Sequence, residues 1–141
     1  MKKILCILAI LATTTTTFAK LNDGKFKAED KDFDRRGWKV YNEITVKDGK
    51  IVGADFDYVN KNGELKSKDI EYNKKYREIS KIDVPELKEL FEADLIKTQN
   101  PNDLEEVAGA TQSLVQFKQL SEVAMKASED NNKNPVSVEV K

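Results

Sequence analysis

The stretch Trp38-Lys-Val-Tyr-Asn-Glu-Ile-Thr-Val-Lys-Asp-Gly-Lys-Ile51 decides the fold. From Trp38 to Val46, every second residue is Trp, Val, Asn, Ile or Val, and the residues between them are mostly charged or polar. This alternation predicts a strand with one buried face. Asp48-Gly49 then predicts a type I′ turn, because both central residues of that turn need positive φ. The stretch therefore predicts the first strand and the turn of a β-hairpin.

The return strand is predicted at Ile51–Val59, with Val52, Ala54, Phe56 and Tyr58 on one face. Asn62-Gly63 indicates a second turn, so residues 38–65 form a hairpin that a further strand could extend into a meander. Residues 23–30 begin at a turn and alternate weakly. Their lysines suit a short, exposed edge strand.

Helices are predicted after the hairpin. One begins near Asp69, and the next begins at Asp83-Val-Pro-Glu86, which combines an N-cap acid, a first-turn proline and a glutamate three residues after the cap. Gln99-Asn-Pro-Asn102 ends this second helix. The apolar face of the second helix consists of Leu87, Leu90, Phe91 and Leu95.

A last helix is predicted at residues 113–127, where Ser113 and Gln116 could form its capping box. Its apolar stripe consists of Leu114, Phe117, Leu120, Ala124 and Ala127. The Asn- and Lys-rich residues 128–141 are predicted to be a disordered tail, although the alternating Val136, Val138 and Val140 leave a docked terminal strand open. The sum is an α+β fold, a single small domain whose antiparallel sheet packs against helices.

Residues 1–19 predict a cleavable signal peptide. Lys2 and Lys3 precede an apolar run, and Thr17-Phe-Ala19 provides a small-x-small cleavage site before Lys20. The apolar run is much shorter than the roughly 20 residues of a membrane span. Cys6 lies near the start of the run rather than after it, which argues against lipid attachment. The sequence therefore predicts an exported protein that is periplasmic, on the cell surface or secreted.

Composition excludes several kinds of chemistry. The chain has no histidine, and its one cysteine lies in the predicted signal peptide. Thiolate nucleophiles, histidine bases and the usual nitrogen- and sulfur-ligated zinc sites are therefore not expected in residues 20–141. The formal net charge is −1, and removal of Lys2 and Lys3 makes it −3. Because no basic stripe is visible, nucleic-acid binding is not expected.

The segment from Glu106 to Ser113, Glu-Val-Ala-Gly-Ala-Thr-Gln-Ser, is the candidate functional site. Gly109 and Ala110 leave room for a ligand to approach the backbone, and the first-turn amides of the following helix point outward. Such a helix start suits a phosphate group. The alternative is structural, because Ser113 could simply cap a helix.

Three stretches, taken in order, resemble the FMN-binding domain family, which includes the flavin-carrying subunits of sodium-pumping redox complexes and small exported relatives. Asp23-Gly-Lys-Phe26 opens the match. The hairpin residues 37–63 continue it, and residues 106–118 contain the most specific block. The resemblance covers nearly all of residues 22–127, so residues 20–127 are expected to form the FMN-binding domain.

The resemblance implies that FMN is joined to Thr111 through a phosphoester that a flavin transferase makes. The phosphate would lie against the amides of Gly109, Ala110, Gln112 and Ser113. The candidates for an aromatic wall beside the flavin ring are Trp38, Tyr58, Tyr72 and Phe117.

On this interpretation the protein is a redox carrier rather than a turnover enzyme. It would take electrons from a membrane redox complex or reductase and associate peripherally with the membrane. The alternative is an exported surface or binding protein that keeps the fold and holds flavin noncovalently or not at all. Ala108, which stands where the family often has Ser or Thr, keeps this alternative open.

Overall fold

A computed structural model describes residues 20–141, so the predicted signal peptide lies outside the described residues. The strands are β1 (Gly24–Asp30), β2 (Lys39–Lys47), β3 (Lys50–Val59) and β4 (Val136–Val138). The helices are α1 (Ile70–Ser80), α2 (Val84–Thr98) and α3 (Thr111–Glu129), with short 3-10 turns η1 (Lys66–Lys68) and η2 (Pro101–Asp103).

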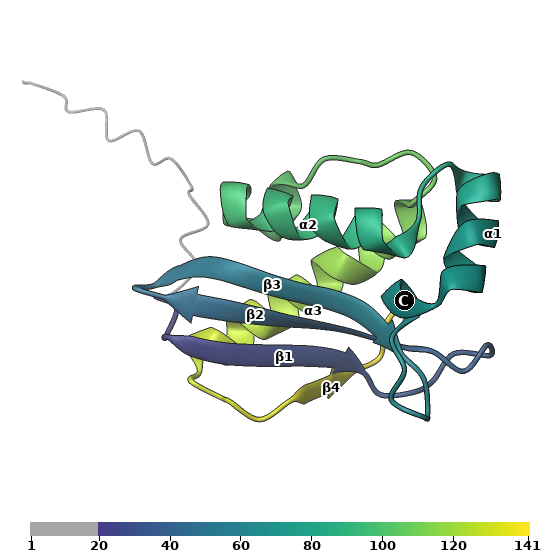
Figure 1. Ribbon diagram of the computed structural model, residues 1–141. Helices are drawn as coiled ribbons and strands as arrows, with labels where there is room; N and C mark the ends of the chain where they lie inside the picture. The colour runs from purple at the N-terminus through teal and green to yellow at the C-terminus, as the bar shows by residue number, and fades with distance from the viewer. Residues whose placement is uncertain (1–19) are drawn as a thin grey trace, which may run out of the picture.

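The sheet has the order β3-β2-β1-β4, with antiparallel pairing throughout except that β4 runs parallel to β1. α3 packs across one face of β1 and β2, and α2 lies against β3 (Figure 1). α1 stands at the end of the sheet where β2 begins and β3 ends (Figure 1). This arrangement confirms the predicted α+β fold of a single small domain.

The predicted hairpin and its turn are confirmed. Asp48 and Gly49 have φ values of 52° and 76°, as a type I′ turn requires. The predicted face of β3 is wrong at its beginning, because a bulge shifts the register between Thr45 and Val46. Ile51 therefore pairs with Val46 and is buried, whereas Val52 is left without a partner and is 49% exposed.

β1 is not the edge strand that its lysines suggest, since it lies between β2 and β4. Phe26 and Ala28 are fully buried beneath α3. The prediction of a disordered tail is also corrected. Residues 136–138 pair with Ala28–Asp30, so the alternative of a docked terminal strand describes this segment. The partly buried side chains of this segment, which pack against the core, are Val136, Val138 and Val140.

Two helix starts follow the expected chemistry. The Asp69 side chain accepts a hydrogen bond from the Tyr72 amide at the start of α1, and Asp83 accepts one from the Glu86 amide at the start of α2. Gln99, the residue that follows α2, has a left-handed backbone and caps the helix. None of the helices within residues 20–141 is long and apolar enough to span a membrane.

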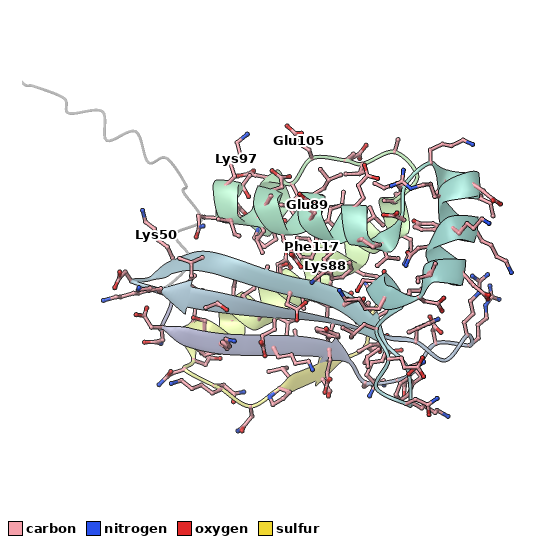
Figure 2. All side chains as sticks on the ribbon, viewed as in Figure 1. Lys50, Lys88, Glu89, Lys97, Glu105 and Phe117 are labelled. Carbon is pink, nitrogen blue, oxygen red and sulfur yellow. The ribbon has the colours of Figure 1, made fainter. Side chains whose placement is uncertain are left out.

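Three phenylalanine rings form the centre of the core. The ring centroids of Phe56 and Phe117 lie 5.1 Å apart, and those of Phe91 and Phe117 lie 5.4 Å apart in a stacked arrangement. Figure 2 shows Phe117 inside the molecule, on α3. Because Phe117 is fully buried by this packing, it is a core residue and not part of an aromatic wall for a ligand.

Candidate functional site

The end of α1 packs against the turn before α3 and fills the space beside Gly109. Gly109 has a φ of 82°, and a Cβ placed on it would lie 2.6 Å from the Ser80 carbonyl oxygen. Ala110 is buried, and its amide donates to the carbonyl oxygen of Val107. The predicted room for a ligand at Gly109 and Ala110 is thus occupied by protein on this side. Of the amides predicted to hold a phosphate, that of Ala110 is therefore already bonded within the protein.

The first turn of α3 is open to solvent. Thr111 and Gln112 are exposed, and no side chain caps the helix at Ala110. In the part of the chain that the structure describes, no acceptor bonds the amides of residues 111–113. Three free amides and the positive end of a 19-residue helix favour an anion here. The Gln112 side chain donates to the Lys141 carbonyl oxygen, which brings the last residues of the chain beside this turn.

Ser113 and Gln116 do not form the capping box that their spacing predicts. Both side chains instead bind the Tyr58 hydroxyl, with Ser113 Oγ at 3.1 Å and Gln116 Oε1 at 2.6 Å. Tyr58 is 7% exposed, and this burial raises the pKa of its hydroxyl above the ordinary value. The end of β3 is therefore tied to the first turns of α3.

An aromatic row leads from the sheet to the turn before α3. Trp38 and Tyr72 have ring centroids 6.5 Å apart, and Tyr72 and Tyr76 have centroids 6.0 Å apart. The Tyr76 hydroxyl donates to the carbonyl oxygen of Gly109. The structure thus brings three of the predicted site residues, Trp38, Tyr58 and Tyr72, to one end of the molecule beside α3. Tyr76 joins them, although sequence reasoning did not select it.

Lys66 is the second residue that sequence reasoning missed. It is 8% exposed, and its Nζ lies 4.3 Å from the ring centroid of Tyr58, 4.6 Å from Tyr72 and 5.6 Å from Trp38. Burial lowers the pKa of this amine. A lysine in a polar turn looks like solvated surface in a sequence. No spacing links Lys66 to the rings of Trp38, just before β2, Tyr58 on β3 and Tyr72 on α1.

Two hollows lie nearby, and both have mixed or acidic linings. One, of about 560 Å³, lies beside Trp38 and is lined by Glu64, Asp69 and Glu71 with Lys68. The other, of about 500 Å³, is lined by residues of β3, η1 and α2. Figure 2 shows two of the residues that line it, Lys88 and Glu89, on α2. Neither hollow contains the amides of residues 111–113, so neither is the predicted phosphate cradle.

The chain is similar to known proteins over most of its length. It is 32% identical over 134 residues to a 15 kDa lipoprotein of Treponema pallidum (strain Nichols), a match that covers 94% of this chain and 92% of the relative. A crystal structure of a Clostridium perfringens protein shares 33% identity with a TM-score of 0.81, over 86% of this chain and 99% of that one. A solution structure from Clostridium thermocellum gives 33% identity and a TM-score of 0.53, over 76% of this chain and 92% of that one.

No protein-family model matches the chain. The resemblance to the FMN-binding domain family therefore stays a prediction. The relatives share the length and the fold of the chain.

Proposed function

The chain belongs to the family of the 15 kDa lipoprotein of Treponema pallidum, and we propose that it is an exported binding protein for FMN or a planar anion of similar chemistry. One observation supports this proposal above the others. Trp38, Tyr58 and Tyr72 gather at the end of the molecule where the uncapped first turn of α3 offers free amides. Aromatic faces beside a helix start suit a ring that carries an anionic group.

Export has two sources of support. The relative is named a lipoprotein, a class of protein that reaches a cell surface or an extracytoplasmic compartment. Residues 1–19 of this chain have the order of a cleavable signal. Because Cys6 is the only cysteine, cleavage after Ala19 leaves no thiol for a lipid. Mass spectrometry of the exported protein should give an N-terminus at Lys20 without acyl mass, and an acylated protein would contradict cleavage after Ala19.

The covalent form of the proposal rests on Thr111. This residue is exposed at the first position of α3, so a flavin transferase could reach its hydroxyl. A phosphate esterified to that oxygen would lie beside the free amides of Thr111, Gln112 and Ser113, where the helix dipole favours negative charge. An ester would also keep the flavin attached after export.

The proposed role of a bound flavin is electron transfer. FMN supplies one- and two-electron chemistry, and the chain contributes binding, orientation and exclusion of water. Such a carrier would exchange electrons with a membrane redox complex or reductase. It would need an accessible flavin edge more than it would need an acid or base.

The decisive experiment is expression of the precursor with a flavin transferase. The denatured product should show flavin fluorescence on a gel and a mass increment of one FMN. Thr111→Ala should lose both signals, and Thr111→Ser, which keeps a hydroxyl, should retain part of them. Thr45→Ala, on β2, is the control and should be labelled like the unaltered protein. A product without flavin in either covalent or noncovalent form would contradict the flavin proposal.

A second candidate is an exported binding protein that holds no flavin. The filled space at Gly109 and the bonded amide of Ala110 favour it, since they reduce the room and the free donors of the cradle that the resemblance implies. On this alternative the turn serves mainly to pack α1 against the start of α3. A protein that stays colourless after reconstitution with FMN, yet binds other aromatic anions, would support this candidate.

A further inference from the structure

Lys66 carries an ammonium group that the protein does not pair. In residues 20–141, no carboxylate lies within ion-pair distance of its Nζ and no acceptor bonds it, although the residue is only 8% exposed. Among these residues, Asn42 Oδ1 is the one side-chain polar atom that is fully buried and has no hydrogen-bond partner. Lys66 Nζ also has no partner, so it is not fully buried. The Lys66 ammonium therefore lies among three aromatic rings and keeps a small contact with solvent.

The protein holds Lys66 in this place through its backbone. Both the amide and the hydroxyl of Ser67 donate to the Asp57 carboxylate, at 3.1 and 2.5 Å. The Asn73 side chain donates to the Lys66 carbonyl oxygen at 2.9 Å. Asp57 and Asn73 are both buried. The η1 turn is thus clamped to β3 and α1, and the amine is preorganised.

The three rings around Nζ offset only part of the free-energy cost of burying its charge. Cation–π attraction replaces some of the lost hydration, but it supplies no hydrogen-bond acceptor for the three ammonium donors. Burial also lowers the pKa of the amine, in agreement with a desolvated cation. An anion that reached Nζ would restore the missing hydrogen bonds.

Charged groups of both signs lie around Lys66, and none of them bonds its Nζ. Asp34 and Asp57 support the charged form of Lys66, but the Asp57 carboxylate is already bonded to Ser67, and Asp34 Oδ1 accepts from the amides of Arg36 and Trp38. Arg36 acts in the opposite direction as a second nearby cation. Its side chain is exposed and forms no ion pair within residues 20–141. One buried and one exposed cation thus lie beside the rings.

We propose that Lys66, with the half-buried faces of Trp38 and Tyr72, binds the oxyanion of a planar aromatic ligand. A carboxylate or phosphate oxygen approaches Nζ from its solvent side, and the attached ring stacks on the exposed parts of Trp38 or Tyr72. Arg36 assists from the rim. This inference deepens the proposed function, since FMN is one such anion, but it depends on Lys66 and not on Thr111.

Trp38 provides the measurement, because it is the only tryptophan of the chain and its ring contacts the Lys66 amine. The exported protein is titrated at pH 7 with benzoate and with inorganic phosphate while Trp38 emission is recorded. FMN and riboflavin, which lacks the phosphate, are compared by equilibrium dialysis. Benzoate should shift the emission more than phosphate does, and FMN should bind more tightly than riboflavin.

Lys66→Met should weaken benzoate and FMN binding by about tenfold or more, as loss of a charge-assisted hydrogen bond requires. Lys66→Arg should retain most of the binding, and Lys75→Met, on the exposed side of α1, should bind as the unaltered protein does. Lys66→Met removes an unpaired buried charge, so the variant is expected to fold, which its urea midpoint checks.

Binding that is unchanged in Lys66→Met overturns the inference. Equal emission responses to benzoate and inorganic phosphate overturn the claim that the ligand is a planar aromatic anion. The two proposals fail separately. FMN attached at Thr111 with no effect of Lys66→Met supports the proposed function against this inference. Lys66-dependent benzoate binding without any FMN binding supports the inference against the flavin.

Discussion

The carbonyl oxygen of Ser80, at the end of α1, lies 2.6 Å from the position that a Cβ on Gly109 would occupy. Gly109 also has a φ of 82°, which side chains disfavour. The glycine of the turn before α3 is therefore required by the contact between two helices. A role in ligand approach would come in addition to this packing role.

Gly109→Ala should consequently destabilise the protein by about 2 to 4 kcal/mol, from the left-handed backbone together with the overpacking. Gly63→Ala is the matched control, since Gly63 has a φ of 78° but nothing within 4 Å of its would-be Cβ. It should cost about 1 kcal/mol. Urea unfolding monitored by circular dichroism measures both. Equal losses for the two variants would show that the Ser80 contact relaxes without cost.

The elements that sequence reasoning predicted well are those whose chemistry is local. The Asp48-Gly49 turn and the Asp83 cap depend on residues within four positions of each other, and both are confirmed. The position of β1 was predicted wrongly because its neighbour β4 comes from more than 100 residues away. The pairing of Tyr58 with Ser113 and the burial of Lys66 likewise depend on contacts between distant elements, which no periodicity reveals.

Asn42 and Ser121 form a buried polar pair between β2 and α3. Asn42 Nδ2 donates to Ser121 Oγ at 3.0 Å, and Asn42 Oδ1 has no partner in the described part of the chain. Ser121→Ala should cost about 1 to 3 kcal/mol, because it leaves the buried amide unpaired. The double variant Asn42→Val/Ser121→Ala should recover most of that loss. A double-mutant cycle by urea unfolding tests this coupling, and additive effects would contradict it.

Lys66 should make stability depend on pH in the alkaline range. Its pKa is lowered in the folded protein, so between that value and the ordinary 10.5 the unfolded chain binds more protons. The free energy of unfolding should therefore rise with pH across this window, relative to Lys66→Met. Comparing the two proteins removes the contribution of the tyrosines, whose raised pKa values act in the opposite direction above pH 10. Parallel curves would show that the amine is solvated.

Gln99 protects the free edge of β3. Its side chain accepts from the Ile51 amide and donates to the Ile51 carbonyl oxygen, both at 2.8 Å, which replaces the pairing of a further strand. Gln99→Ala should lower stability by about 1 kcal/mol and increase self-association through the exposed edge. Size-exclusion chromatography with light scattering measures the association. Lys97→Ala, an exposed neighbour on α2, is the control and should remain unchanged.

Deletion of residues 135–141 tests the docked tail. β4 pairs with Ala28–Asp30, and Val136, Val138 and Val140 pack against the core. The deletion should lower the free energy of unfolding by about 2 kcal/mol, because it exposes apolar surface and leaves one edge of β1 unpaired.

Ser137→Ala is the control for this deletion, since Ser137 is exposed on the same strand and its change should be neutral. Hydrogen exchange at the amides of Ala28–Asp30 gives a second measure, because only the backbone pairs with β4 protect that edge. A disordered tail would leave both the unfolding curve and the exchange unchanged. A loss of stability with faster exchange confined to β1 would instead show that these last residues complete the sheet.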